Sequence, residues 1–366
     1  MTDPGLAALT AAQRDLVGRF KSGQPLALSR TISLVENHRP GFESVLEALH
    51  TGVGAARRIG ITGPPGAGKS TLTASLARRY RDRGLTVGII AVDPSSPFTG
   101  GALLGDRVRM DDLATEPGIF IRSMASRGSH GGLAAATREA ADLLDAFGFD
   151  RILLETVGVG QSELEVASSA DSTMVVLVPE SGDGIQAMKA GLMEVADLFV
   201  VNKADRPGAD RLKKEIEVVL ALRSGRKSPG TTAHHGVDLS AIRQDRQAGA
   251  DDGGATGSEA ESEAWEVPVL RCVASTGEGV MDVSEALDAH FEWLESTGRL
   301  AEQRGEQAIE HARLVLERAT GRRAMSAWKQ WLAGRDARSE VESRSPYAIS
   351  RSVYASLWPN DPGSDR

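Results

Sequence analysis

Residues 63–71 of the 366-residue chain read Gly63-Pro64-Pro65-Gly66-Ala67-Gly68-Lys69-Ser70-Thr71. This stretch has the spacing of a phosphate-binding loop, in which glycines frame the loop and a lysine and a hydroxyl residue end it. Glycines at these positions let successive backbone N–H groups face an anion at the positive end of the following helix. The residues of the loop are therefore predicted to bind nucleotide phosphates, with Lys69 at the outer phosphates and Ser70 at Mg²⁺.

The segments around this loop alternate between apolar runs of strand length and segments with helical periodicity, from residue 57 to about residue 205. That alternation predicts an α/β fold of the phosphate-loop NTPase kind, with a doubly wound, mostly parallel sheet. The predicted strands are 58–62, 86–92, 118–122, 151–156, 172–179, 198–202 and, after an interruption, 267–273. Helices are expected between them, for example where Leu72, Leu76 and Tyr80 recur at helical spacing, and again over 281–295.

Two parts are expected at and before this sheet. Residues 1–56 are predicted to form an N-terminal helical extension, because Leu26, Ile32 and Val45 recur at helical spacing. Residues 57–297 are predicted to form the nucleotide-binding domain.

Two further stretches differ from the sheet in composition. Residues 224–264 hold few large aliphatic side chains and no aromatic one, so this insert is predicted to be disordered. Residues 298–366 are predicted to form a C-terminal helical arm and tail. Its long charged helix, over 301–332, is expected to carry Ile309, Leu316 and Trp328 on one side.

Composition limits the partners of the chain. Lysine and arginine number 42 against 50 aspartates and glutamates, and the net charge of -8 disfavours nucleic acid as the main partner. No apolar run approaches the roughly 18 residues that cross a bilayer, so we expect no membrane association and a cytoplasmic location. Cys272 is the only cysteine, which excludes an internal disulfide and a multi-thiolate metal site.

A second motif follows a predicted strand and reads Asn202-Lys203-Ala204-Asp205. A carboxylate at Asp205 can accept hydrogen bonds from the ring N–H and the exocyclic amine of guanine, whereas adenine presents an acceptor in place of the ring donor. Lys203 is expected to lie over the base, and Asn202 to join this segment to the phosphate loop. GTP and GDP are therefore the predicted ligands. The next strand ends in Val273-Ala274-Ser275, where a backbone N–H could reach the guanine oxygen.

Acidic residues at strand ends indicate a magnesium site. Asp93, Asp106 and Glu155 follow or end predicted strands near the phosphate loop, and Mg²⁺ prefers such hard oxygen ligands. The amide of Gly158 is placed to contact the terminal phosphate. Lys69, Glu155 and Gly158 are the predicted catalytic residues. We identify no water-positioning side chain, so slow intrinsic hydrolysis is expected.

Together these residues resemble the MeaB/MMAA/ArgK GTPases, which are chaperones of adenosylcobalamin-dependent acyl-CoA mutases, typically methylmalonyl-CoA mutase. The resemblance rests on segments that generic phosphate-loop proteins lack, namely 33–36, 63–71, 91–97, 101–110, 121–132, 155–161 and 182–191. It implies a mutase partner, a homodimer and a glutamate at the magnesium-linked position. It also implies that residues 182–191 form a loop coupling the nucleotide state to the mutase, with Asp183, Gln186 and Lys189 as its polar residues.

Two other functions are open at this point. The first is a phosphate-loop kinase or transport-associated ATPase, against which Asp205 argues because it selects guanine and because no acceptor pocket can be named. The second is a nickel-insertion GTPase, which would need a cluster of cysteine and histidine ligands that one cysteine and scattered histidines do not supply.

Overall fold

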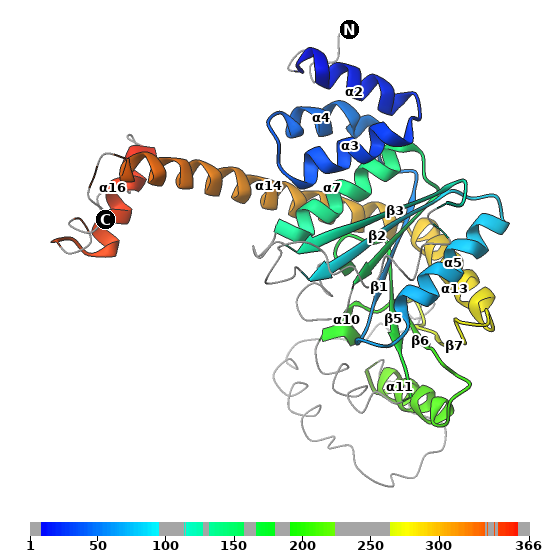
Figure 1. Cartoon of the computed structure of the whole chain (residues 1–366). Helices are drawn as coiled ribbons and strands as arrows, with labels where there is room; N and C mark the ends of the chain where they lie inside the picture. Colours follow the sequence, from blue (N-terminus) through cyan, green and yellow to red (C-terminus); the bar gives the residue numbers. More distant parts are fainter. Residues whose placement is uncertain are drawn as a thin grey trace.

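A seven-stranded parallel sheet forms the centre of the molecule, with helices on both faces (Figure 1). The computed structural model describes residues 9–94, 113, 115–126, 132–156, 166–179, 191–223, 264–333, 335, 340 and 343–357. The strands are β1 (Arg57–Thr62), β2 (Val87–Pro94), β3 (Ile119–Ser126), β4 (Arg151–Thr156), β5 (Ser172–Leu177), β6 (Leu198–Val201) and β7 (Val269–Arg271). This confirms the predicted doubly wound α/β fold, and every predicted strand is present with its ends shifted by a few residues.

The strand order is β3-β2-β4-β1-β5-β6-β7, and all pairings are parallel. The central strand β1 therefore has β4 on one side and β5 on the other, while the next strand along the chain, β2, lies beyond β4. From β1 the chain crosses past β4 to β2, whereas from β4 it crosses past β1 to β5, in the opposite direction. In open α/β sheets, ligands bind in the crevice at the carboxyl ends of the strands where the order switches. The loop that follows β1 lies at this crevice.

Two helical layers cover the sheet. The helices are α2 (Ala11–Lys21), α3 (Pro25–Glu36), α4 (Phe42–Leu49), η1 (His50–Gly52), α5 (Lys69–Asp82), α7 (Gly132–Phe147), α10 (Met193–Val195), α11 (Ala209–Arg223), α13 (Val280–Ser296), α14 (Arg299–Leu332) and α16 (Pro346–Leu357). Helices α5 and α13 share one apolar core with the sheet, and in that core Leu72, Leu76 and Tyr80 are fully buried, as their spacing predicts. Helix α7 and the N-terminal helices share another core with the opposite face.

The N-terminal helices are joined to α7 by apolar contacts. Ile32 and Val45 are fully buried in that core, whereas Leu26 is 61% exposed because it lies in the first turn of α3, on the side away from α7. A capping box starts α2, in which Thr10 and Gln13 exchange side-chain to backbone hydrogen bonds. The N-terminal segment is therefore helical from residue 11. It packs against α7, which in turn packs against the sheet.

Helix α14 leaves this body and carries α16 near its far end (Figure 1). It has 34 residues and so a length of about 50 Å, and none of its residues is buried. Ile309 and Leu316 are 74% and 67% exposed. Within the part of the chain that the structure describes, no helix is both long and apolar enough to cross a membrane. The predicted insert lies outside the described residues except for Ala264.

Candidate nucleotide-binding site

The phosphate-loop stretch connects the end of β1 to the first residue of α5. Two of its glycines cannot carry a side chain. Gly63 has a φ of 134°, and a Cβ there would lie 2.1 Å from the backbone oxygen of Val176 on β5. Gly68 has a φ of 85°, and its Cβ would lie 2.4 Å from Nδ2 of Asn202. The spacing of glycines in the sequence thus reflects the close approach of this loop to β5 and to the residue that follows β6.

Lys69 lies across the phosphate loop. Its Nζ donates hydrogen bonds to the backbone oxygens of Gly63, at 2.8 Å, and Pro64, at 3.0 Å, and the side chain is buried. The backbone oxygen of Lys69 in turn accepts a bond from Oγ1 of Thr73 at 2.9 Å, one turn further along α5. The positive charge is therefore held at the mouth of the loop, where α5 begins.

Ser70 and Glu155 form the other half of the phosphate end of the site. The Oγ of Ser70 donates to Oε1 of Glu155 at 2.6 Å, and both residues are buried. The register that pairs Ile61 with Glu155 places this carboxylate at the carboxyl edge of the sheet, beside the loop. A hydroxyl and a carboxylate in contact are hard oxygen donors of the type that Mg²⁺ takes, so the residues present fit that ion.

The remaining predicted phosphate and magnesium residues are placed only in part. Asp93 lies in β2, where the register pairs it with Ala125 of β3, while its side chain is not among those described. Asp106 and Gly158 lie outside the described residues, as do Asp183, Gln186 and Lys189 of the predicted coupling loop. The structure therefore brings together Lys69, Ser70 and Glu155, and the other assignments stay predictions.

Asn202 is the contact between the base motif and the phosphate loop. Its Nδ2 donates to the backbone oxygen of Ala67 at 2.8 Å, and its Oδ1 accepts from the backbone N–H of Ala274 at 3.1 Å. The side chain is buried, so these bonds are shielded from water. One amide thus joins three segments that lie far apart in the sequence.

Lys203 follows in a left-handed conformation, with a φ of 54°, which is uncommon for a residue with a side chain. Its Nζ donates to the backbone oxygen of Gly66 at 2.9 Å. The aliphatic part of the side chain therefore spans the gap between the end of β6 and the phosphate loop. Asp205, two residues later, is exposed at the same edge of the sheet, where its carboxylate is accessible to a ligand.

Two residues of this site belong to none of the sequence motifs. Oγ of Ser75, on α5, donates to the backbone oxygen of Ala274 at 2.7 Å. Cys272 donates its thiol to Oδ1 of Asn202 at 3.4 Å, and burial raises the pKa of that thiol to about 12. Ser75 could not be identified from the sequence, because no motif includes it and its partner lies 199 residues away.

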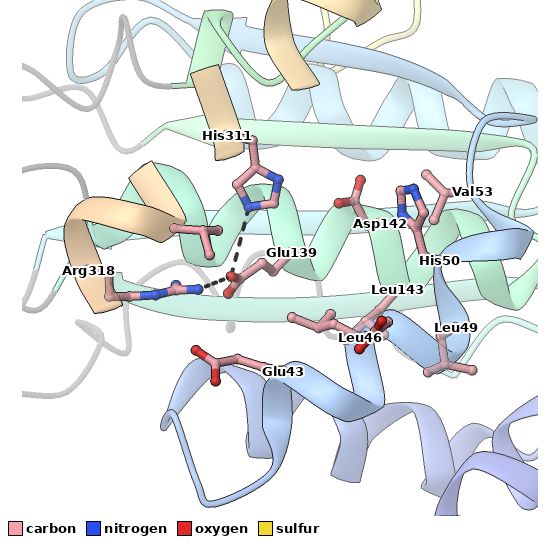
Figure 2. Close-up of a pocket in the computed structure, with 12 residues that line it drawn as sticks. Glu43, Leu46, Leu49, His50, Val53, Glu139, Asp142, Leu143, His311 and Arg318 are labelled. Carbon is pink, nitrogen blue, oxygen red and sulfur yellow. Dashed lines mark hydrogen bonds and ion pairs between the residues drawn. The ribbon is translucent and has the colours of Figure 1, made fainter. Parts of the chain in front are cut away.

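A cleft lies away from this site, between α4, α7 and α14 (Figure 2). It has a volume of about 220 Å³, and its lining holds none of the phosphate-loop or base-motif residues. Figure 2 shows Glu139 of α7 between His311 and Arg318 of α14. Burial alone would raise the pKa of Glu139, but the bonds from His311 and Arg318 lower it overall. The cleft therefore lies where the middle of α14 crosses α7 and α4.

Known proteins are similar to this chain over a region much longer than the nucleotide motifs. The family described as methylmalonyl Co-A mutase-associated GTPase MeaB matches residues 28–328. A putative GTPase of Pyrococcus horikoshii is 43% identical over 302 residues, which are 82% of this chain and 85% of the relative. GTPase ArgK of Escherichia coli is 35% identical over 311 residues, 84% of each chain. The mitochondrial methylmalonic aciduria type A homolog of Mus musculus is 32% identical over 300 residues, 78% of this chain and 64% of the relative.

A solved structure gives the same result for the fold. The crystal structure of a LAO/AO transport system kinase has a TM-score of 0.63 and 26% identity to this chain, and it covers 95% of this chain and 99% of its own. The family match runs from within α3 to near the end of α14, so it includes most of α3, all of α4 and most of the long helix besides the sheet. The resemblance inferred from the sequence is thereby confirmed, and the chain belongs to the MeaB family of GTPases.

Proposed function

We propose that this chain binds GTP together with Mg²⁺, hydrolyses it to GDP and phosphate, and acts as a chaperone of an adenosylcobalamin-dependent acyl-CoA mutase of the methylmalonyl-CoA mutase type. The contact between Ser70 and Glu155 at the phosphate loop is the observation that carries the nucleotide chemistry. The family description supports the choice of partner, because it names proteins associated with methylmalonyl Co-A mutase.

At the phosphate end, the side chains supply positive charge and a place for the metal. Ser70 and Glu155 would hold Mg²⁺, which would neutralise charge on the phosphate oxygens. Lys69 would exchange its bonds to loop oxygens for contacts with the outer phosphates, and the amide of Gly158 would contact the terminal phosphate. Because we identify no water-positioning side chain, we expect intrinsic turnover of about 1 per minute or slower.

At the base end, specificity would come from Asp205 and from the loop that follows β7. Asp205 would accept two hydrogen bonds that guanine can donate and adenine cannot. The backbone of residues 273–275 would contact the guanine oxygen. Equilibrium binding of GTP and ATP to the purified chain tests this end directly: we expect binding of GTP and at least about a hundredfold weaker binding of ATP.

Coupling to the mutase would run through residues 182–191, in a cytoplasmic complex. The test is GTP hydrolysis with and without an adenosylcobalamin-dependent mutase, for wild type, Lys189→Ala and the control Lys213→Ala on α11. We expect the mutase to accelerate hydrolysis by wild type and by the control, and to leave Lys189→Ala slow although it still binds GTP. Full stimulation of Lys189→Ala removes the loop from the coupling path. Absence of stimulation in wild type contradicts the chaperone function.

The competing function, a kinase, predicts a different product. The solved relative is named as a transport system kinase, so the assay should measure both the GTP consumed and the inorganic phosphate released. For a GTPase, every GTP consumed yields one inorganic phosphate, whether or not other proteins are present. Consumption of nucleotide without an equal release of inorganic phosphate would indicate phosphoryl transfer to an acceptor.

We also propose a homodimer that forms through residues 298–366, with residues 57–297 as the GTPase domain and 1–56 as its N-terminal extension. Helix α14 supports this proposal, because Ile309, Leu316 and Met325 on it are 74%, 67% and 54% exposed. Exposed apolar side chains along a projecting helix gain stability when a second copy covers them. Light scattering should report a dimer for wild type and a monomer for Leu316→Glu, with Glu302→Gln as the unaffected control.

A further inference from the structure

Ser75 is the residue of α5 that touches the base end of the site. We infer that Ser75 is a positioning residue, which orients the peptide group between Ala274 and Ser275 and thereby sets guanine preference and the rate of nucleotide release. The inference rests on the proposed function in one respect, namely that guanine is the base read beside this loop.

The first step is the hydrogen bond itself. Oγ of Ser75 donates to the backbone oxygen of Ala274 at 2.7 Å, across 199 residues of sequence. Ala274 is 3% exposed, so its carbonyl has little access to water. Ser75 is the one side chain among the described residues that bonds to this carbonyl. Its loss would leave a buried carbonyl unpaired at the full cost of desolvating that group, so the bond has a defined effect on the loop.

The second step is the geometry of the peptide group. The carbonyl of Ala274 and the N–H of Ser275 belong to one planar trans peptide, so they point in opposite directions. When Ser75 fixes the carbonyl toward α5, it also fixes where the N–H of Ser275 points. Ser275 is exposed, and within the described part of the chain this N–H makes no hydrogen bond. It is therefore a donor held in one orientation and available to an acceptor such as O6 of guanine.

The peptide group on the other side of Ala274 is fixed as well. Its N–H donates to Oδ1 of Asn202 at 3.1 Å, and Asn202 also binds the oxygen of Ala67 in the phosphate loop. The loop beyond Ala274 closes on itself, since the N–H of Val273 donates to the oxygen of Glu278 at 2.9 Å. Of the two side chains that hold Ala274, only Asn202 belongs to a recognised motif.

The third step is the helix that carries Ser75. Lys69 and Ser70 form the first turn of α5, and Ser75 lies six residues after Lys69 in the same helix, about 9 Å along its axis. A rigid helix therefore contacts the phosphates at one end and positions the base-reading peptide near its middle. Loss of the Ser75 hydroxyl should loosen the base contact without removing any group that contacts phosphate.

The experiment separates base reading from phosphate binding by changing one atom of the nucleotide. In 6-thio-GDP a sulfur replaces O6 and is a poorer hydrogen-bond acceptor, while the ring N–H and the amine that Asp205 would bind are kept. Affinities for GDP and 6-thio-GDP are measured for wild type, Ser75→Ala and the control Ser284→Ala. Ser284 lies on α13 and, among the described residues, donates to Met281 of its own helix alone.

Wild type and the control should bind GDP more tightly than 6-thio-GDP. In Ser75→Ala the ratio of these two affinities should fall by about 3- to 10-fold, which is the contribution of one hydrogen bond. Release of a fluorescent GDP analogue should be faster in Ser75→Ala by a similar factor. The isosteric pair Ser75→Thr and Ser75→Val provides a second test if the alanine variant folds poorly. Thr should keep the wild-type preference, and Val should lose it.

An unchanged preference and release rate in Ser75→Ala and Ser75→Val overturn the role of Ser75 while guanine recognition stands. A different outcome overturns both proposals: wild type that binds GDP and 6-thio-GDP equally, or that fails to bind GDP, has no O6 contact for Ser75 to position. An equal loss of affinity for both nucleotides in Ser75→Ala also overturns the inference, because it would indicate general destabilisation of the site.

Discussion

Oγ of Ser70 lies 2.6 Å from Oε1 of Glu155, and this contact joins the first turn of α5 to the last residues of β4. Both residues are buried, so the pair stays in contact without competition from water. The contact depends on strand register, because β1 and β4 pair Ile61 with Glu155 and so bring the carboxylate level with the start of the loop. The sheet therefore holds the two hard oxygen donors together at the start of the loop.

The first prediction concerns this carboxylate. Replacing Glu155 by alanine should lower GTP turnover at saturating Mg²⁺ by about 10- to 100-fold, as expected when a group that supports a metal site is lost. Nucleotide affinity should change much less, because Lys69 and the loop amides remain. Turnover and GDP affinity are measured over a Mg²⁺ titration, with Glu217→Ala on α11 as the control. Equal turnover in wild type and Glu155→Ala would remove this residue from the site.

The second prediction concerns the base motif. Asp205→Asn should weaken GTP binding by about 10- to 100-fold, because the negative charge is lost and the amide NH2 cannot accept a hydrogen bond from the exocyclic amine of guanine. The same variant should bind xanthosine triphosphate better than wild type does, since the added carbonyl of xanthine suits an amide donor. Titration calorimetry with both nucleotides measures the exchange, and Asp282→Asn on α13 is the control. Unchanged GTP affinity in Asp205→Asn would show that another group reads the base.

A feature can be predicted from the sequence when residues that are close together in the chain determine it. The phosphate loop can be recognised from the sequence because its glycines, lysine and serine act within nine residues and their backbone geometry is set there. The strands can be recognised because a buried parallel strand needs a continuous apolar run. The helical spacing of residues 1–50 likewise located the N-terminal helices, although it did not show that Leu26 is exposed.

Contacts between distant segments could not be predicted in the same way. The bond from Ser75 to Ala274 spans 199 residues, and a serine in a helix more often bonds to its own turn. The role of Cys272 beside Asn202 also depends on strand register and not on local spacing. The spacing of apolar residues on α14, such as Ile309, is typical of one side of a packed helix, yet no residue that the structure describes covers them.

The third prediction concerns stability at the start of β1. The carboxylate of Asp145 on α7 is buried and accepts four hydrogen bonds, from the backbone N–H groups of residues 54–56 and from Nη2 of Arg58 at 2.9 Å. Asp145→Ala would leave Arg58 with one partner fewer and three backbone donors without their acceptor. We expect a loss of about 3 to 5 kcal/mol in the free energy of unfolding.

Chemical denaturation measures that loss, and an exposed aspartate provides the control. Asp15 pairs with Arg19 one turn away on α2, and its replacement by alanine should change the free energy of unfolding by no more than about 0.5 kcal/mol. The two variants remove the same group from a buried and an exposed position. A loss of less than about 1 kcal/mol in Asp145→Ala would contradict the prediction, since it would mean that water replaces the carboxylate at little cost.

A half-buried acid and a buried imidazole lie together at the amino end of the strands, on the opposite edge of the sheet from the phosphate loop. Asp197 accepts a bond from the backbone N–H of Thr173 at 2.7 Å, and its Oδ1 lies 3.4 Å from Nε2 of His290. The other ring nitrogen of His290 lies 2.8 Å from Oγ of Ser172. Burial raises the pKa of Asp197 to about 7 and lowers the pKa of His290 to about 4. The two groups therefore have opposite effects on stability over the same pH range.

The last prediction concerns how Asp197 changes the free energy of unfolding with pH. Because the pKa of Asp197 is higher in the folded than in the unfolded chain, the folded state binds more protons between about pH 4 and pH 7, and the contribution of Asp197 to stability falls as pH rises through this range. Asp197→Asn removes this term and leaves that of His290, so the difference in unfolding free energy between variant and wild type reports Asp197 alone.

We expect a difference near zero at pH 4, a rise in favour of the variant up to about pH 7, and a plateau above it. The plateau should be about 1 to 2 kcal/mol, because a side chain still 31% exposed is partly screened by water. Urea denaturation at pH 4.5, 6 and 7.5 measures the difference. A difference that shrinks as pH rises would mean that the folded chain stabilises the ionised carboxylate.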